Sequence, residues 1–325
     1  MNDRTCAILR LLRESNDYLS GSRLSRELGI TRAAVWKQIA VLREEGHRIE
    51  ATPSRGYRLL SSPDLLDEPS LRSLLPTGCL VGRRLVCAAA TSSTNSDAFR
   101  LAEEGAPEGT VVLADSQSGG KGRLGRRWES PAGVNLYCSV ILRPPLLPHE
   151  ASQLTFLSAV AVARTIEAVT GLHPGIKWPN DLLLGERKVA GLLNEMSAET
   201  DRVGFVILGI GVNINMQAHQ FPDGLRHPAT SLLLASGTTV SRSVFTVRLF
   251  QELAAGYERF LREGFDPVRE EWAGRSTAFG REVAVDTGAG ILRGPFSGID
   301  RDGALLLQRP DGSLERVLSG DVTVY

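Results

Sequence analysis

The segment Gln117–Trp128, Q-S-G-G-K-G-R-L-G-R-R-W, restricts the fold more than any other part of the sequence. It contains four glycines and four cations within twelve residues. Glycine lets the backbone adopt positive φ and approach a ligand closely, and successive free N–H groups in such a loop can hold an anion. Lys121, Arg123, Arg126 and Arg127 add positive charge. We therefore expect a mobile loop that closes over a phosphate-bearing ligand.

Two other glycine motifs must be compared with this loop. Gly120, Gly122 and Gly125 have the G-x-G-x-x-G spacing of dinucleotide sites, and a predicted strand, 110–114, precedes them. The residues that follow, 126–133, do not form the apolar helix that this fingerprint requires. The G-x-x-x-x-G-K-[ST] pattern of the P-loop is absent. A solvated basic turn remains the alternative if the loop is considered alone.

Further motifs occur along the chain. Thr91–Asn95 reads T-S-S-T-N, Lys177–Asp181 reads K-W-P-N-D, Arg187–Leu193 reads R-K-V-A-G-L-L, and Gly209–Asn215 reads G-I-G-V-N-I-N. Together with the loop, and in the same order, they resemble the motifs of the biotin protein ligases. The sequence departs from that family once in the loop, because Lys121 stands where arginine is usual. The charge is kept, but the bidentate guanidinium is lost.

The composition is that of an ordinary soluble protein, with 42% hydrophobic and 23% charged residues. A formal net charge of zero excludes a role for the whole molecule as a polyanion binder. Residues 1–60, however, contain eleven Lys and Arg against seven Asp and Glu, so they have a net charge of +4 and the remainder −4. This asymmetry predicts an anionic partner for the N-terminal part.

The cysteines predict free thiols. Cys6, Cys79, Cys87 and Cys138 form no C-x-x-C pair, and no histidine lies at metal-ligand spacing, so no metal-ligating residue is assigned. Unpaired cysteines of this kind are typical of a reducing cytosol. The sequence has neither a secretory signal pattern nor an uncharged apolar stretch long enough to span a bilayer. We therefore expect a cytoplasmic protein with no membrane partner.

The N-terminal residues have a helix-turn-helix pattern. An amphipathic helix is predicted over residues 5–19, followed by a short helix that Ser22 caps and that reaches Leu28. After a tight turn, Thr31 is expected to cap a second helix, 32–45. Such a layout places the start of the second helix in the major groove of DNA.

A hairpin, or wing, is predicted to follow between His47 and Leu60 with Arg55 at its tip. The helix sequence R-A-A-V-W-K-Q-I is similar to the recognition helix of bifunctional biotin repressors. The pattern, the charge and this resemblance predict contacts to operator DNA from Arg32, Ala33, Trp36, Lys37 and Arg55. The alternative is a helical bundle whose basic face is only solvated.

The expected domains are a winged helix-turn-helix at 1–62, a catalytic domain at 70–272 and a C-terminal domain at 275–325. Mixed strands and helices predict an α+β central domain whose mixed sheet is covered by helices on one side. Its two long helices are expected at 153–170 and 242–262. Beyond Arg275, short alternating strands separated by glycine turns indicate a small β-barrel, which resembles the SH3-like domain of the ligases.

The resemblance implies two half-reactions. The carboxylate of biotin attacks the α-phosphate of ATP to give biotinyl-5′-AMP, and a lysine of the biotin carboxyl carrier protein of acetyl-CoA carboxylase then attacks this anhydride. Cations must gather two anions and spread the charge that develops on phosphorus, and a closed loop must exclude water from the adenylate. Lys188 and Arg123 are assigned these catalytic roles. Mg²⁺ is expected to accompany ATP.

The resemblance also implies two sets of binding residues. Biotin is assigned to Ser93, Thr94, Asn95, Gln117, Lys121, Gly122, Arg123 and Lys188. The adenylate is assigned to Gly120, Lys121, Arg126, Trp128, Asn180, Asp181 and Asn213. From the residues alone, Lys188 can equally be a surface lysine, Trp128 a core residue and Asp181 a turn-stabilising residue. Asp181 is assigned to the ribose–phosphate region or to Mg²⁺.

The same resemblance predicts regulation. Biotinyl-5′-AMP would also be a corepressor, and a homodimer of the adenylate-bound protein would repress biotin synthesis genes at a two-fold operator. Three alternatives stay open: a ligase whose winged helix no longer binds DNA, a ligand-sensing regulator without ligase activity, and a lipoate ligase.

Overall fold

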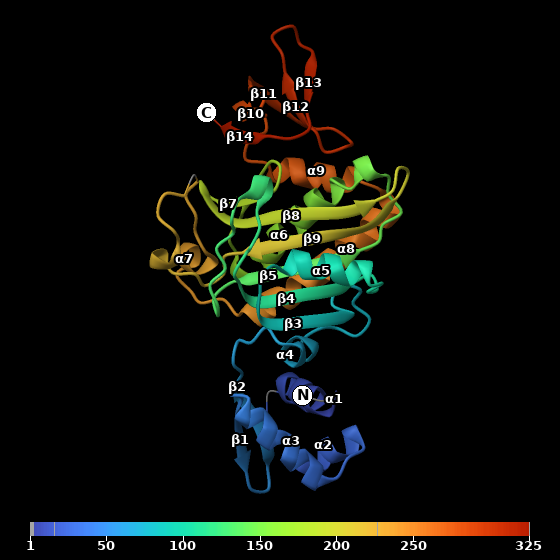
Figure 1. Cartoon of the computed structure of the whole chain (residues 1–325). Helices are drawn as coiled ribbons and strands as arrows, with labels where there is room; N and C mark the ends of the chain where they lie inside the picture. Colours follow the sequence, from blue (N-terminus) through green and yellow to red (C-terminus); the bar gives the residue numbers. More distant parts are fainter. Residues whose placement is uncertain (1–2, 16, 226, 325) are drawn as a thin grey trace. The chain divides into compact units, whose positions relative to one another are not determined.

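The computed structural model describes residues 3–15, 17–225 and 227–324. The chain divides into two compact units, Met1–Thr77 and Gly78–Tyr325 (Figure 1). The expected three-domain limits of 1–62, 70–272 and 275–325 stay a prediction. Among the described residues, no helix is both long and apolar enough to cross a membrane.

The N-terminal unit is a helix-turn-helix followed by a hairpin. Its elements are α1 (Asp3–Glu14), α2 (Gly21–Leu28), α3 (Arg32–Glu44), β1 (Arg48–Thr52), β2 (Gly56–Ser61) and α4 (Glu68–Arg72). The helices and the hairpin share one apolar core, formed by Ile8, Leu9, Leu12, Leu19, Leu24, Val35, Ile39, Leu42 and Ile49. The predicted winged layout is therefore confirmed.

The first helix is shorter than predicted. It ends at Glu14 and not at residue 19, because Leu19 has left the helical path and pairs with Tyr57 of the hairpin. The Leu19 N–H donates to the Tyr57 carbonyl at 2.8 Å, and the Tyr57 N–H donates back at 2.9 Å. A tertiary pairing thus ends the amphipathic pattern early.

Of the two N-caps predicted for the helix-turn-helix, one is confirmed and the other is wrong. Thr31 caps α3 as predicted, since its hydroxyl accepts from the Ala34 N–H at 3.2 Å. The predicted cap at Ser22 is wrong, because Ser22 lies inside α2 and Ser20 accepts from the Arg23 N–H at 3.1 Å. Both serines suit an N-cap chemically, so composition alone does not choose between them.

The C-terminal unit is built on a seven-stranded mixed sheet with the order β3-β4-β5-β9-β8-β7-β6. Only β3 and β4 are parallel, and each of the other neighbouring pairs is antiparallel. The strands are β3 (Arg84–Thr91), β4 (Thr110–Gln117), β5 (Leu136–Leu142), β6 (Gly175–Lys177), β7 (Asp181–Leu184), β8 (Arg187–Ala198) and β9 (Val203–Val212). A mixed sheet in an α+β domain was predicted and is confirmed.

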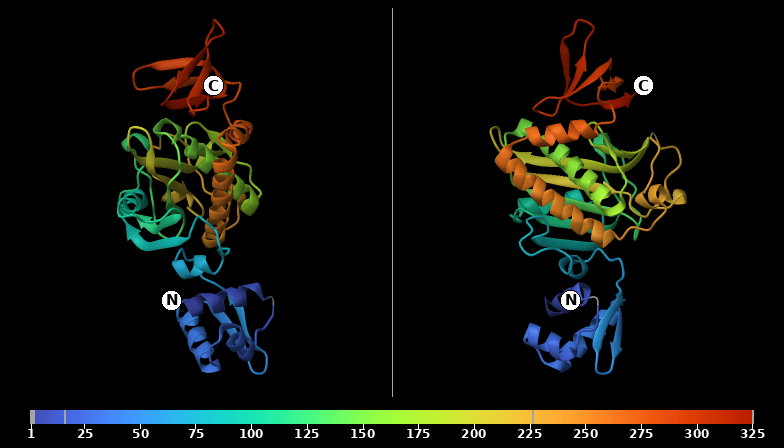
Figure 2. Two further views of the ribbon diagram at one scale, coloured as in Figure 1. Left: turned by 90° about the vertical axis from the view of Figure 1, so that its right-hand side faces the viewer. Right: turned by 180° about the vertical axis from the view of Figure 1, so that it is seen from behind.

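Helices cover both faces of this sheet, and the expectation of one covered side is wrong. Helix α5 (Thr94–Glu103) packs on one face through a small cluster with Val112, Ile141 and Ile207. Helices α6 (Gln153–Thr170) and α8 (Arg242–Glu263) lie on the opposite face (Figure 2). Alternate residues of a strand point to opposite faces, and the central strands are buried on both, as a two-sided core requires.

The chain continues through α9 (Asp266–Arg275) into a five-stranded antiparallel sheet with the order β13-β12-β11-β10-β14. Its strands are β10 (Glu282–Asp286), β11 (Ile291–Ile299), β12 (Leu305–Gln308), β13 (Leu314–Val317) and β14 (Asp321–Val324). Trp272 of α9 is fully buried and has edge contacts with the rings of Phe156 and Phe296, 5.3 Å and 6.2 Å between centroids. The finer SH3-like assignment of this sheet stays a prediction.

Three short helices were not predicted. Helix α4 follows the hairpin, where Asp67 caps it and Leu71 is fully buried. Pro69 lies in its first turn, a position where proline fits a helix. Helix α7 (Leu232–Ser236) and α9 are also additional, and burial of Leu232 and Trp272 fixes them.

Candidate active site

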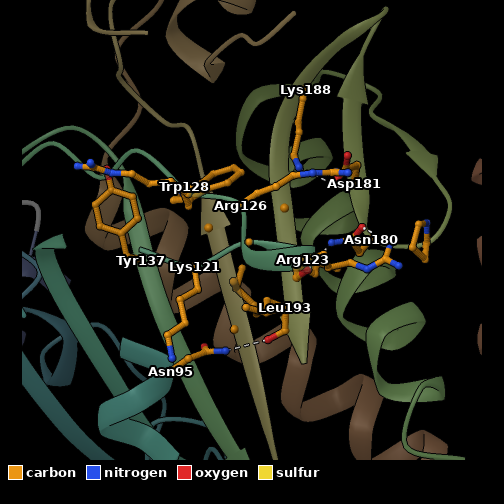
Figure 3. A pocket seen from close by; sticks show the side chains of 18 of the residues that line it. Asn95, Lys121, Arg123, Arg126, Trp128, Tyr137, Asn180, Asp181, Lys188 and Leu193 are labelled. Atoms are coloured by element: carbon orange, nitrogen blue, oxygen red, sulfur yellow. Dashed lines mark hydrogen bonds and ion pairs between the residues drawn. The ribbon is translucent and has the colours of Figure 1, made fainter. Parts of the chain in front are cut away.

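One open cavity of the C-terminal unit is lined by most of the sequence motifs, and such a concave site with a few convergent polar groups is typical of a small-molecule or cofactor site. Its walls come from the start of α5, the end of β4, the glycine-rich loop, the turn between β6 and β7, and strands β8 and β9. Side chains from these elements converge on it in Figure 3. Polar and cationic groups predominate over acidic ones.

The floor of the cavity is made by two glycines paired across β8 and β9, on which the Trp128 ring lies. Gly191 and Gly211 are register partners. A Cβ atom on Gly211 would lie 2.7 Å from Trp128 Cε2, and one on Gly191 would lie 2.9 Å from Cζ3. The strands therefore need glycine here because the indole approaches so closely. Trp128 is half-buried, and its contact with the adenylate stays a prediction.

Lys188 stands beside this ring. Its Nζ atom is 2.5 Å from Asp181 Oδ1 and 5.3 Å from the centroid of the Trp128 ring. The side chains of Lys188 and Asp181 are 25% and 17% exposed, so the ion pair is only partly screened by water. The lysine is thus held at the cavity by a carboxylate and an aromatic face, and the surface-lysine alternative does not fit its place.

The K-W-P-N-D turn is tied to β8 by Asn180. Its Nδ2 group donates to the Leu192 carbonyl at 2.6 Å, and the Leu192 N–H donates back to the Asn180 carbonyl at 3.0 Å. Arg123 from the loop donates to Asn180 Oδ1 at 3.5 Å and to the Gly320 carbonyl at 3.4 Å. Burial lowers the pKa of Arg123, while Asp321 and Asp181 act in the opposite direction.

The glycine-rich loop folds into a small hairpin of its own. Lys121 and Arg127 form an isolated antiparallel bridge, and the Gly122 N–H donates to the Arg126 carbonyl at 2.7 Å. Leu124 and Gly125 at the tip have φ of 58° and 72°, the left-handed conformation that glycine adopts readily. No regular helix follows the loop, as expected when the dinucleotide fingerprint was rejected.

Each loop cation has a partner. The Lys121 ammonium donates to Ser96 Oγ at 2.9 Å, and Arg127 pairs with Glu129 at 3.1 Å. Arg126 forms a two-point contact with Asp321 of β14, and this hydrogen-bonded carboxylate raises the pKa of Arg126. The loop is therefore connected to α5 on one side and to the C-terminal sheet on the other.

The start of α5 is predicted to recognise biotin, and it has an unusual cap. Ser93 occupies the N-cap position without a side-chain capping bond. Instead, Gln117 Oε1 accepts from the Thr94 N–H at 2.9 Å. Gln117 Nε2 in turn donates to Ser130 Oγ at 3.0 Å. The end of β4 thus holds the first turn of α5 through a side chain.

The structure brings nearly all predicted biotin and adenylate residues to this one cavity: Ser93, Thr94, Asn95, Gln117, Lys121, Gly122, Arg123, Arg126, Trp128, Asn180, Asp181 and Lys188. Gly120 does not line it, because it packs beneath the loop against the Trp128 carbonyl. Asn213 is buried and donates to the Thr230 carbonyl at 3.1 Å. Their binding roles stay predictions.

Comparisons with known proteins agree with this arrangement. The family model for the biotin/lipoate A/B protein ligase family matches residues 87–213, a model described as HTH domain matches 4–58, and one for the biotin protein ligase C terminal domain matches 278–325. The bifunctional ligase/repressor BirA of Bacillus spizizenii is 40% identical over 307 residues, which cover 94% of each chain. The chain belongs to the bifunctional ligase/repressor family of biotin protein ligases.

Two further relatives extend this result. The biotin–[acetyl-CoA-carboxylase] ligase of Paracoccus denitrificans is 37% identical over 228 residues, 69% of this chain and 94% of that protein. The solved structure of the Aquifex aeolicus biotin protein ligase in complex with biotin and ATP matches with a TM-score of 0.63 and 29% identity. It covers 75% of this chain and 99% of its own.

In this member of the biotin protein ligase family, a second cavity adjoins the first, and Trp128 lines both. It shares Arg126, Asp181 and Lys188 with the first cavity, and its apolar lining includes Met216, Phe221, Pro222 and Leu225. Sequence reasoning missed these apolar residues because they lie in an irregular segment without periodicity. It also missed Tyr137 and Asp321, which only the tertiary fold brings to the first cavity.

Among the residues that the structure describes, no group of three or more His, Cys, Asp and Glu side chains is arranged to hold a metal ion. Asp181, assigned to the ribose–phosphate region or to Mg²⁺, pairs with Lys188. The expectation of Mg²⁺ therefore depends on the phosphates of the nucleotide, and it stays a prediction.

The family's helix-turn-helix presents its predicted DNA residues to solvent. The exposed residues are Arg32, Ala33, Trp36 and Lys37. Trp36 is 65% exposed and does not belong to the apolar core of the N-terminal unit. Arg55 at the wing pairs with Asp17 at 3.0 Å, and its guanidinium lies 4.1 Å from the centroid of the Tyr18 ring. The wing cation is thus held in place by the segment between α1 and α2.

Proposed function

We propose that the chain activates biotin with ATP and transfers it to a lysine of the biotin carboxyl carrier protein of acetyl-CoA carboxylase. The observation that carries the proposal is that Lys188, the loop cations and the polar start of α5 line a single cavity. A ligand with a neutral polar head, an apolar body and a carboxylate would fit between them. The names of the relatives, a ligase/repressor and a biotin–[acetyl-CoA-carboxylase] ligase, support it.

In the first half-reaction a carboxylate oxygen of biotin attacks the α-phosphorus, a new P–O bond forms, and pyrophosphate leaves. Two anions must meet, so the cations Lys188 and Arg123 would bind the carboxylate and the α-phosphate and stabilise the charge on phosphorus. The observed Lys188–Asp181 ion pair, 2.5 Å, would hold the ammonium ready for this contact. Mg²⁺ would reach the site on the pyrophosphate portion of ATP.

The purine has a site beside Trp128. The indole lies close to Gly191 and Gly211, and it also lines the second cavity with its apolar residues. An adenine ring packed on this indole would place the α-phosphate towards Lys188, which both cavities share.

In the second half-reaction a neutral lysine amine attacks the acyl carbon of the adenylate, and AMP leaves.

We also propose that the chain represses biotin synthesis genes by binding operator DNA. The exposed, unpacked Trp36 beside Arg32 and Lys37 at the start of α3 supports a recognition helix rather than a solvated bundle. The adenylate would act as corepressor by favouring a homodimer, since a two-fold operator requires two copies. The test is the affinity of the adenylate-bound protein for operator DNA. An affinity that is undetectable, or that does not depend on salt concentration, would contradict this function.

The ligase proposal is tested by transfer of biotin to a carrier domain in the presence of ATP. We expect transfer by the wild type and a decrease of about 10²-fold or more in Lys188→Ala. Arg187→Ala, an exposed cation at the adjacent position, is the matched control and should keep full activity. Transfer of lipoate but not biotin by the wild type would support the lipoate alternative. No transfer of either would support a regulator without ligase activity.

A further inference from the structure

A buried chain of hydrogen bonds runs behind the cavity wall from Thr94 to Glu195. Asn95 Nδ2 donates to Glu195 Oε2 at 2.7 Å and to the Leu193 carbonyl at 3.1 Å. The Ser139 hydroxyl lies 2.6 Å from Asn95 Oδ1 and 2.8 Å from Thr94 Oγ1. Ser139 is fully buried, and Thr94 and Asn95 are nearly so. Neither Ser139 nor Glu195 lines the cavity.

The direction of each hydrogen bond follows from the number of protons that each group can donate. Both groups that face Asn95 Nδ2 are acceptors, so the orientation of the Asn95 amide is fixed and its Oδ1 can only accept. Ser139 has one hydroxyl proton, and it must point to Asn95 Oδ1 at 2.6 Å. The 2.8 Å contact between Ser139 and Thr94 therefore needs the proton of Thr94.

This assignment leaves the Thr94 oxygen as an acceptor towards the cavity. Its contact with Gln117 Oε1 is longer, 3.2 Å, and Gln117 Oε1 already accepts from the Thr94 N–H at 2.9 Å. Gln117 Nε2 uses one proton for Ser130, and the described residues take up no second one. Thr94 and Gln117 both line the cavity, so they offer an acceptor and a donor side by side. A cyclic urea presents the complementary N–H and C=O on one edge.

We propose that Glu195 is a positioning residue for the ureido end of biotin. Its carboxylate ends the chain Thr94–Ser139–Asn95–Glu195 and, together with the Leu193 carbonyl, fixes the Asn95 amide, which makes Thr94 an acceptor for a ligand N–H. Gly209 leaves the space that the Asn95 amide needs, because a Cβ atom at position 209 would lie 2.2 Å from Asn95 Oδ1. The inference deepens the proposed ligase function and rests on it.

The test uses three full-length variants. Glu195→Leu removes the acceptor at similar volume, Glu195→Gln keeps an acceptor oxygen, and Glu199→Leu is the control. Glu199 is exposed just beyond β8 and pairs with Arg202. Binding of biotin alone is measured by titration calorimetry, and KM for biotin and for ATP by pyrophosphate release. Melting temperatures show whether each variant is folded, and Ser139→Ala, which interrupts the chain in the middle, replaces Glu195→Leu if that variant does not fold.

Glu195→Leu should weaken biotin binding and raise its KM about tenfold, the effect of one lost hydrogen bond, with KM for ATP unchanged. Glu195→Gln should recover most of the loss, and Glu199→Leu should match the wild type. Unchanged biotin binding, an equal rise in both KM values, or a Gln variant as defective as Leu would overturn the inference. A wild type that binds biotin but releases no pyrophosphate would contradict the ligase proposal and leave the titration as the test of Glu195. A wild type that does not bind biotin would overturn both.

Discussion

Arg126 of the glycine-rich loop and Asp321 of β14 form a two-point ion pair, with Nη1 3.2 Å from Oδ1 and Nη2 in contact with Oδ2. The two residues are 195 positions apart in the sequence. Arg123 from the same loop reaches the Gly320 carbonyl next to Asp321. The C-terminal sheet therefore holds the loop over the cavity through two arginines, of which Arg126 is a predicted adenylate ligand and Arg123 a predicted catalytic and biotin-binding residue.

The first prediction concerns this contact. Asp321→Asn should make the loop more mobile without ligand, because the pair is partly exposed and contributes at most about 1 kcal/mol. Amide hydrogen exchange at residues 119–127 should become up to about fivefold faster. Biotinyl-5′-AMP should slow exchange in both proteins, since the ligand replaces the carboxylate as the partner of the cations. Equal protection of the loop with and without ligand in the wild type would contradict a loop that closes.

The second prediction concerns the glycine floor. Gly211→Ala should displace the Trp128 ring, because the added Cβ atom would lie 2.7 Å from Cε2 and 2.8 Å from Nε1. We expect the free energy of unfolding to decrease by about 1–3 kcal/mol. KM for ATP should rise about tenfold, with a smaller change for biotin, because one stacking partner of the purine is lost.

Gly274→Ala is the matched control for the glycine floor. Gly274 lies in α9, and nothing is within 4 Å of the position of an added Cβ atom. Denaturant unfolding and steady-state kinetics measure both variants. The control should be neutral or slightly stabilised, since alanine favours a helix. A Gly211→Ala protein with unchanged KM for ATP would show that Trp128 does not contact the nucleotide.

Much of the fold could be predicted because it depends on local periodicity. The limits of α6 agree with the predicted helix at 153–170, and β4 contains the predicted strand at 110–114. Early termination of α1 could not be foreseen, since the pairing of Leu19 with Tyr57 is a tertiary contact. The choice between Ser20 and Ser22 as a cap is likewise decided by where the chain enters the helix.

The candidate site could be predicted in its composition but not in its connections. The motifs and their order indicated which residues would meet, and the cavity contains nearly all of them. Three relationships needed the fold: the contact of Asp321 with the loop, the ion pair of Asp181 with Lys188, and the place of Trp128 on two glycines. The first and the third join residues far apart in the chain, so no local pattern encodes them. The second joins residues of the paired strands β7 and β8, and it needs their register.

The third prediction concerns the wing. Arg55→Ala should weaken binding of operator DNA and reduce the slope of log affinity against log salt by about one, because one phosphate contact is lost. Asp17→Asn should strengthen binding a few-fold at most, since an exposed pair competes only weakly with phosphate. Arg262→Ala, an exposed cation on α8, should leave both quantities unchanged. Salt-dependent binding assays with adenylate present measure all three, and an unchanged slope for Arg55→Ala would exclude the wing from the interface.

The last prediction concerns pH. His47 is 3% exposed, and its Nδ1 atom is 3.1 Å from Ser62 Oγ. Burial lowers its pKa below 6.5, nearby Arg13 lowers the pKa further, and Asp67 acts in the opposite direction. The unfolded chain therefore binds a proton at higher pH than the folded one. The stability that neutral His47 provides is fully present above about pH 6.5 and decreases as the pH falls below that value.

His47→Gln removes this titration while keeping a polar side chain near Ser62. The free energy of unfolding of the wild type should decrease more steeply than that of His47→Gln as the pH falls from about 6.5 to 5. Denaturant unfolding of both proteins across this range, followed by a probe in the N-terminal unit, measures the difference. An NMR titration of the imidazole gives the folded pKa directly. A midpoint at or above 6.5, or parallel stability curves for the two proteins, would show that burial does not disfavour the charged ring, because the folded chain would then bind the proton at least as well as the unfolded chain.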